Sequence, residues 1–177
     1  FYPKSINKEC TTNIINRLLK HSDGNVYAFC NRSVFKCSMN QTVETVFPDI
    51  AIPSPTYSVA QAPDKDIYIG TESNGLYIYS ENWKLKKHVP IDGIIATILP
   101  DNNGDIWLGL DETGICLFNK NKQTFTWLHK DNTNLNNNSI RTFVPYGDSS
   151  ILVGTFRGLN ILNKKELTIT PANINIA

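Results

Sequence analysis

The residues whose types could carry acid–base or metal chemistry are dispersed along this sequence. His21, His88 and His129 lie far from one another and from any cysteine at ligand spacing, so we expect no metal site. Asp111 and Glu112 are adjacent carboxylates, but neighbouring residues in a turn point apart, whereas glycoside hydrolysis needs two carboxyl groups that face each other across a substrate. We therefore interpret this pair as part of a solvated turn.

The sequence also lacks the motifs that mark common catalytic sites. It contains no Gly-x-Ser-x-Gly turn, no His-Glu-x-x-His helix and no phosphate-binding loop, and each of these would be readable from sequence alone. We predict no catalytic residue, no cofactor and no enzymatic activity for this segment.

The four cysteines form no recognisable site either. Cys10, Cys30, Cys37 and Cys116 lack the close spacing of a zinc site and the density of a disulfide scaffold. Cys116 lies in an apolar stretch, which favours a buried thiol. Cys30 and Cys37 flank one predicted hairpin without facing each other, so a disulfide between them is the less favoured alternative.

Charge and hydropathy restrict the partners of the chain. Lys and Arg number 17 against 16 for Asp and Glu, and the basic residues form no stripe of the kind that follows a phosphate backbone. The longest apolar runs have the length of strands and are too short to span a membrane. We expect neither nucleic acid nor membrane contact within this segment.

The strongest pattern in the sequence is an internal repeat. Its clearest copy is residues 102–118, where a turn, an apolar strand, a glycine-containing turn and a second apolar strand follow one another. Weaker copies begin at Asp23, Asp64 and Asp148, and the copies recur roughly every 40–45 residues, the period of four-stranded propeller blades. The sequence therefore predicts an all-β fold of about four blades, a partial propeller or half-ring.

The blade boundaries follow from the turns and prolines. Residues 48–55 contain Pro48, Pro53 and Pro55, which do not fit the middle of a sheet and so indicate a loop between blades. We treat residues 1–177 as a single β-propeller segment, with residues 1–12 as a candidate outer strand of a preceding blade. The predicted blades are residues 13–47, 56–89, 94–129 and 139–170.

Several predicted strands are apolar at consecutive positions. Residues 67–69, 106–108 and 151–153 show no polar alternation, which predicts that both faces of these strands are buried. Blades stacked between neighbours bury their strands in this way. We accordingly expect Trp107 and Tyr68 to lie in the core and not on a sugar-stacking platform.

The best-preserved repeats resemble a known family. Residues 104–109, Gly-Asp-Ile-Trp-Leu-Gly, show a turn, an apolar residue, Trp, an apolar residue and Gly, and residues 139–142, Ser-Ile-Arg-Thr, precede the pairs Gly154-Thr155 and Gly158-Leu159. These segments resemble two-component regulator propeller repeats, which build the periplasmic sensor region of hybrid two-component system histidine kinases. The first repeat departs from the pattern, with Tyr27 at the Trp position and Phe29 at the Gly position.

This resemblance implies a segment of the ectodomain of an inner-membrane protein. Such a segment would take part in periplasmic sensing of carbohydrate-derived ligands, with the kinase chemistry on other domains. A free-standing propeller interaction module, or a propeller enzyme of lyase or hydrolase type, is the alternative.

Ligands of propellers tend to bind where the turns between second and third strands meet the connections between blades. Here these segments are residues 31–33, 72–74, 111–113 and 156–157, with the connections at 48–55 and 131–139. For an oligosaccharide ligand, we expect hydrogen bonds from Arg32, Glu72, Asp111 and Arg157 and a stacking surface from Phe156. A purely structural role in the turns is the favoured alternative for these residues.

The terminal blades raise the question of what covers their outer faces. Val26 and Phe35 in the first blade, and Leu152 and Leu162 in the last, provide no polar cap. We therefore expect the isolated chain to self-associate through exposed blade faces, with two chains completing a larger ring. A closed four-bladed ring and covering by other parts of the protein are the alternatives.

Overall fold

The computed structural model describes residues 14–30, 33–38, 43–45 and 52–172. Within these ranges the chain forms strands and turns and no helix. No segment of the described chain is therefore a candidate for a membrane-crossing helix. The chain divides after Asp92 into two compact units.

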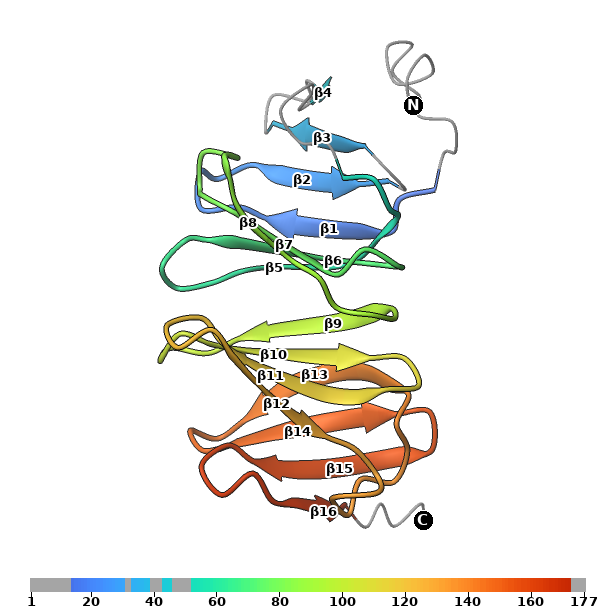
Figure 1. The fold of residues 1–177 in the computed structure, drawn as a ribbon. Helices are drawn as coiled ribbons and strands as arrows, with labels where there is room; N and C mark the ends of the chain where they lie inside the picture. The colour runs from blue at the N-terminus through green and yellow to red at the C-terminus, as the bar shows by residue number, and fades with distance from the viewer. Residues whose placement is uncertain (1–13, 31–32, 39–42, 46–51, 173–177) are drawn as a thin grey trace, which may run out of the picture. The chain divides into compact units, whose positions relative to one another are not determined.

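The first unit contains two antiparallel sheets whose strands pair in chain order (Figure 1). One sheet is built from β1 (Arg17–Lys20), β2 (Val26–Phe29), β3 (Val34–Cys37) and β4 (Val43–Thr45). The other is built from β5 (Thr56–Gln61), β6 (Ile67–Thr71), β7 (Leu76–Tyr79) and β8 (Leu85–Val89). The first strands of the two sheets, β1 and β5, contact each other.

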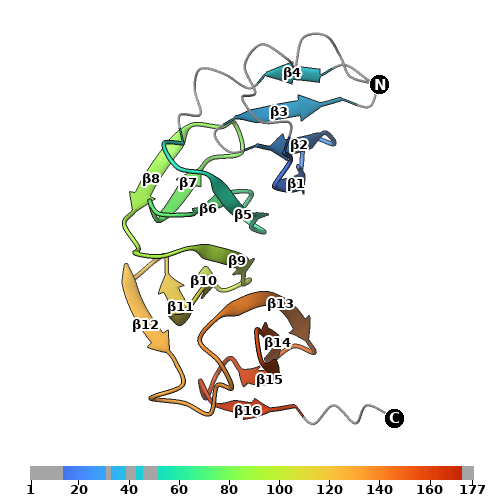
Figure 2. The same ribbon diagram turned by 90° about the vertical axis from the view of Figure 1, so that its right-hand side faces the viewer.

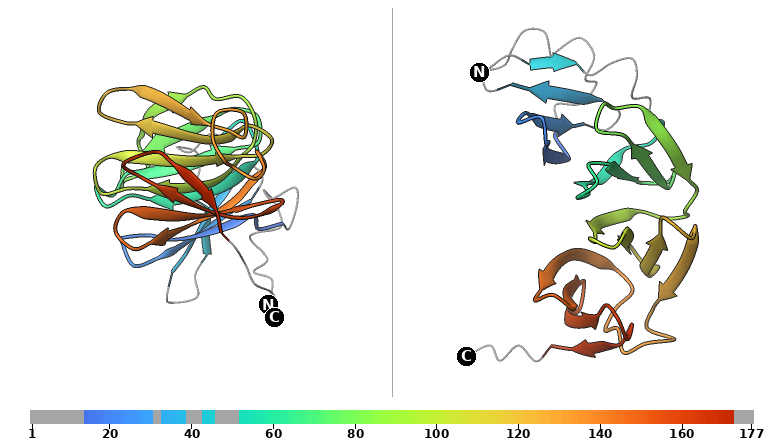
Figure 3. Two further views of the ribbon diagram at one scale, coloured as in Figure 1. Left: turned by 90° about the horizontal axis from the view of Figure 1, so that it is seen from below. Right: turned by 90° about the vertical axis from the view of Figure 1, so that its left-hand side faces the viewer.

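The second unit repeats this arrangement, and its strands can be followed in Figures 2 and 3. One sheet consists of β9 (Ile95–Pro100), β10 (Asp105–Leu110), β11 (Gly114–Asn119) and β12 (Thr124–Leu128). The other consists of β13 (Ile140–Tyr146), β14 (Ser150–Thr155), β15 (Gly158–Asn163) and β16 (Ile169–Pro171). Again the first strands, β9 and β13, lie side by side. Four four-stranded antiparallel meanders confirm the predicted all-β fold with blade-like sheets.

The consecutive apolar strands β6 and β10 are buried on both faces, as their sequences predicted, whereas in β14 Leu152 is only half-buried and the prediction fails for one face. All of β6 is buried, and Trp107 on β10 is 1% exposed. In the second unit Trp107 packs with Phe143, Ile151 and Val153 in a core between the two sheets. The prediction that Trp107 and Tyr68 are core residues, and not sugar platforms, is confirmed.

The core of the first unit is centred on an aromatic residue from a turn. Trp83 lies in the turn before β8 with a φ of 60°. Its ring lies close to those of His21, Tyr27, Phe29 and Tyr79, all from strands or turns of the same unit. A left-handed φ is unfavourable for a bulky residue, and burial of the indole offsets that cost.

Cys30, Cys37 and Cys116 lie within the described residues, and all three are reduced thiols. No disulfide therefore joins Cys37 to Cys30, and Cys116 is buried as predicted.

The residues predicted to lie on open faces of the terminal blades are more buried than expected. Phe35 and Leu162 are 3% and 0% exposed. That prediction is wrong for both residues: Leu162 packs in the core between the two sheets of the second unit, and Phe35 packs with Ala28 and Cys30 in a separate cluster on the first sheet. Residues 1–12 fall outside the described ranges.

Candidate ligand-binding site

One end of the second unit contains three of the segments predicted to face a ligand. In antiparallel meanders the β10–β11 turn, the β12–β13 connection and the β14–β15 turn lie at the same end of their sheets. Backbone hydrogen bonds join these segments, since Gly114 N donates to Asn138 O at 2.8 Å and Phe156 N donates to Ser139 O at 2.9 Å. The three segments therefore form one continuous surface.

A β-bulge near the start of a sheet directs one side chain toward this surface. The pairing register of β13 with β14 shifts between Ile140 and Thr142, which leaves Arg141 as the extra residue. The same shift occurs in β5, where Tyr57 is the extra residue. Bulges re-aim side chains and are frequent next to functional sites. Both Arg141 and Tyr57 are exposed.

Arg141 joins two of the predicted ligand residues. Its guanidinium lies 3.3 Å from Asp111 Oδ2, and the same group lies over the Phe156 ring at 5.4 Å from the centroid. Phe156 is 71% exposed, although large aromatic side chains are usually buried. Because Arg141 covers one face of the ring, Phe156 is held in place while remaining largely open to solvent.

Sequence reasoning selected Asp111 and Phe156 but not Arg141. A residue two positions into a strand carries no signal that marks it as exposed at a sheet end, because the bulge becomes visible only in the pairing register. Arg157, also predicted, donates its backbone N–H to Thr155 Oγ1 at 3.1 Å and is exposed. Its guanidinium is not part of the Asp111–Arg141–Phe156 group.

Glu72 lies in a separate cleft within the first unit. The cleft has a volume of about 400 Å³ and is lined by Asn16, Arg17, Pro55, Thr56, Tyr57 and Glu72. Glu72 N donates to Pro55 O at 3.0 Å, which fixes the β6–β7 turn against the start of β5. A carboxylate, a guanidinium and an aromatic ring thus line one cleft. Arg32 lies outside the described residues.

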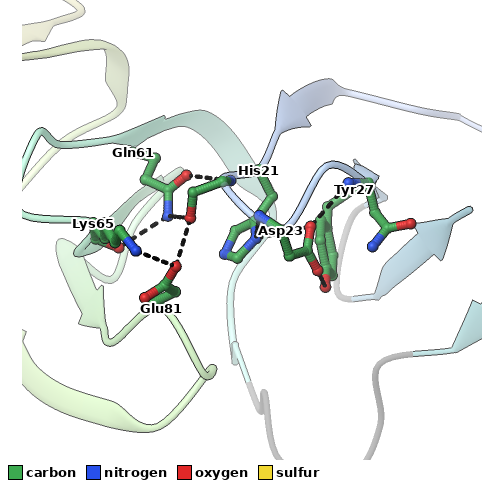
Figure 4. Close-up of polar contacts among 8 residues, drawn as sticks. His21, Asp23, Tyr27, Gln61, Lys65 and Glu81 are labelled. Carbon is green, nitrogen blue, oxygen red and sulfur yellow. Dashed lines mark hydrogen bonds and ion pairs between the residues drawn. The ribbon is translucent and has the colours of Figure 1, made fainter.

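A cluster of titratable side chains lies at the other end of the first unit (Figure 4). His21 Nδ1 lies 3.0 Å from Asp23 Oδ1, and the Tyr27 hydroxyl donates to Asp23 Oδ2 at 2.9 Å. Burial raises the pKa of Asp23, but hydrogen bonds from Asn25, Tyr27 and His21 outweigh it and lower the pKa to about 2. Sequence analysis missed this cluster because Gln61, Lys65 and Glu81 join it from segments far from His21 and Asp23 in the chain.

This cluster is not arranged as a nucleophile with its base. The Ser22 hydroxyl donates to Glu81 Oε1 at 2.9 Å and accepts from Gln61 Nε2 at 3.1 Å, and Glu81 is also paired with Lys65 at 3.0 Å. His21 contacts Asp23 and stacks on Trp83 instead of approaching the hydroxyl. Nucleophilic catalysis requires a hydrogen bond from the nucleophile to its base, and Ser22 makes none to His21. The role of the network is structural, because it joins the β1–β2 turn to the second sheet of the unit. Among the described residues, no group of His, Cys, Asp and Glu side chains could hold a metal ion.

Several solved structures share this fold. The extracellular domain of BT4673 from B. thetaiotaomicron, described as a hybrid two-component system, matches with a TM-score of 0.78 and 17% identity over 95% of this chain and 22% of that one. The extracellular domain of BT3049 from the same organism, described likewise, matches with a TM-score of 0.70 and 24% identity over 93% of this chain and 23% of that one. The computationally designed protein Ika8 matches with a TM-score of 0.63 and 12% identity over 85% of this chain and 45% of that one. No protein-family model and no curated protein matches the sequence.

These comparisons establish the fold of the chain and not its function. A designed protein shares the architecture, and one fold hosts many functions. The chain also spans less than a quarter of the length of the two extracellular domains, at 22% and 23%. The resemblance read from the repeats is confirmed in this sense: the chain has the fold of extracellular domains of hybrid two-component systems.

Proposed function

We propose that this chain is a non-catalytic segment of the periplasmic sensor ectodomain of a hybrid two-component histidine kinase, and that it contributes to the binding of a carbohydrate-derived ligand. Two extracellular domains of such systems have its fold over more than nine-tenths of its length, 95% and 93%. The kinase chemistry would belong to other parts of the parent protein.

The observation that supports ligand binding is the Asp111–Arg141–Phe156 group. A pyranose ring has an apolar C–H face and a rim of hydroxyls, so it fits an exposed aromatic ring flanked by charged hydrogen-bonding groups. Phe156 offers the ring, Asp111 offers acceptor oxygens, and Arg141 offers guanidinium donors beyond the one facing Asp111. The ion pair fixes the Asp111 and Arg141 side chains in the free protein, so less conformational entropy is lost when a ligand binds.

The cleft at Glu72 offers the same three chemical groups in the first unit. Tyr57 supplies the ring, Arg17 the donors and Glu72 the acceptors. We propose it as a second place where the same class of ligand could be held.

The test is a binding screen of plant and host oligosaccharides against the intact ectodomain by calorimetry. Phe156→Ala and Arg141→Gln should each weaken binding of a hit by about tenfold or more, because each removes a direct ligand contact. Tyr146→Ala is the matched control for Phe156→Ala. Tyr146 is an exposed aromatic residue (55%) at the far end of β13, the strand that carries Arg141. Equal affinities for Phe156→Ala and the wild type would exclude this site.

A further inference from the structure

The end of the second unit opposite the Asp111–Arg141–Phe156 group contains a cavity that is larger than the cleft at Glu72. A cavity of about 790 Å³ lies among the β9–β10, β13–β14 and β15–β16 turns. The residues that matter to its chemistry are Asp101, Asn102, Asp148, Ser149, Lys164 and Lys165. Its volume lies in the range of small-molecule sites. None of its residues belongs to the Asp111–Arg141–Phe156 group.

An ion pair between the two sheets of this unit lies at the cavity. Lys164 Nζ lies 3.0 Å from Asp101 Oδ2, and the two side chains are 25% and 17% exposed. Burial raises the pKa of Asp101, but the hydrogen bond from Lys164 and the backbone N–H of Asn102 outweigh it and lower the pKa overall. The buried Trp107 indole N–H faces the same carboxylate without reaching normal hydrogen-bond geometry. Lys164 N also donates to Ser149 O at 2.8 Å, which joins two of the turns.

The remaining charged groups of the cavity are not paired. Asp148 on the β13–β14 turn and Lys165 on the β15–β16 turn are exposed, and their charged atoms have no partner among the described residues. With Asp101 and Lys164, they give the cavity two carboxylates and two ammonium groups. These charges cancel, so the lining favours neither a simple anion nor a simple cation.

The geometry points to a binding site for a zwitterionic ligand, a short peptide with free termini, whose ammonium group pairs with Asp148 and whose carboxylate pairs with Lys165. Charge-assisted hydrogen bonds of both signs would then be satisfied at once. A volume of about 790 Å³ accommodates more than a single amino acid, which favours a peptide of a few residues. None of the described residues that line the cavity is aromatic, so this lining lacks the stacking surface that the Phe156 site offers to a sugar.

Triglycine is the probe for this proposal. Titration into the ¹⁵N-labelled chain should shift the amide signals of residues 101–103, 147–151 and 164–165 and leave those around Phe156 unchanged. N-acetyl-triglycine amide, which has the same backbone without charged termini, should bind at least about tenfold more weakly. Maltotriose, which has hydroxyl groups but no charged termini, should leave the same signals unshifted. A shift with maltotriose would indicate a site that binds polyols in place of zwitterions.

Two exposed variants test the assigned charges without disturbing the fold. Asp148→Asn and Lys165→Gln should each weaken triglycine binding by about tenfold, and the first should also weaken binding of glycine methyl ester, which keeps only the ammonium group. Lys122→Gln is the matched control, because Lys122 is an exposed lysine on the β11–β12 turn at the same end of the unit. Absence of triglycine binding at about 10 mM, or equal binding of the capped peptide, would overturn the proposal.

Discussion

Ile140 on β13 approaches Gly109 on β10 so closely that a Cβ at position 109 would lie 2.5 Å from Ile140 Cγ2. The same Cβ would lie 2.5 Å from Thr97 Cγ2 on β9. The glycine of the repeat is therefore required by the packing of one sheet against the next, since its φ is not left-handed. Gly154 occupies the matching position of the last sheet, where a Cβ would lie 2.7 Å from Thr142 Cγ2.

Gly109→Ala should destabilise the second unit by about 1–3 kcal/mol, because adding a methyl group to a packed site forces its neighbours apart. Urea denaturation followed by tryptophan fluorescence measures the change. Gly147→Asn is the control: Gly147 lies in the same unit as Gly109, has open space around it and has a φ of 61°, close to the left-handed value that Asn adopts most readily. A stability of Gly109→Ala equal to the wild type would show that the two sheets can move apart at no cost.

Much of this fold was predictable because its pattern is local. The strands around Ile67, Ile106 and Ile151 are apolar at consecutive positions, and turn residues bound them on both sides. Strand pairing between neighbours in sequence then follows from the short turns. The first repeat carries Phe29 at the glycine position, yet it forms the same sheet, because Phe29 is accommodated in an aromatic core that includes Trp83.

The site was predictable only in part. Asp111 and Phe156 could be named from their place in turns, but their connection through Arg141 depends on a bulge and on contact between two sheets. Asp101 and Lys164, which are 63 residues apart in sequence, meet for the same reason. Contacts between residues of different sheets produce no periodic pattern in the sequence, so these pairs can be identified only from the structure.

Trp107→Ala should lower the free energy of unfolding by about 3–5 kcal/mol, the range for removal of a buried large aromatic side chain. Its indole is 1% exposed and packs against the neighbouring sheet of the unit. Trp127→Ala is the control, since Trp127 is 37% exposed at a sheet edge and should cost about 1 kcal/mol or less. Thermal and urea unfolding give both values. A loss below about 1 kcal/mol for Trp107→Ala would contradict the core assignment.

Asp23 should make the stability of the first unit depend on acid pH. Burial raises its pKa, but hydrogen bonds, led by that from the Asn25 backbone, lower it to about 2 from an ordinary value of 3.8. A pKa that is lower in the folded state stabilises the protein above about pH 4, and this contribution is lost as the pH falls from 4 toward 2. After allowance for solvent screening, we expect about 1 kcal/mol.

The comparison of wild type with Asp23→Asn isolates this contribution. The difference in unfolding free energy should be largest above about pH 4 and should shrink toward zero near pH 2. Asp148→Asn removes an exposed carboxylate that has no hydrogen-bond partner in the described part of the chain, so it should show no such convergence. A difference that stays constant between pH 5 and pH 2 would mean that the hydrogen bonds to Asp23 do not depend on its charge.

Self-association is the remaining prediction, and it depends on the outer face of the last sheet. Val144, Leu152 and Ile161 are paired across β13, β14 and β15, so they form one apolar row. Val144 is 50% exposed and the other two are half-buried, whereas Leu162 points into the core. Exposed apolar rows of this kind usually mark contact surfaces, and the end of a stacked architecture needs a partner or a polar cap.

Light scattering on the purified chain should therefore give a mass of about twice the chain mass of 19.9 kDa, falling on dilution. Val144→Lys should shift the equilibrium to the monomer, because association would bury an unpaired charge. Thr126→Lys, on the exposed strand β12, should leave the mass unchanged. A monomer mass for the wild type that holds across dilution would show that this face remains soluble without a partner and would leave other parts of a longer protein as its cover.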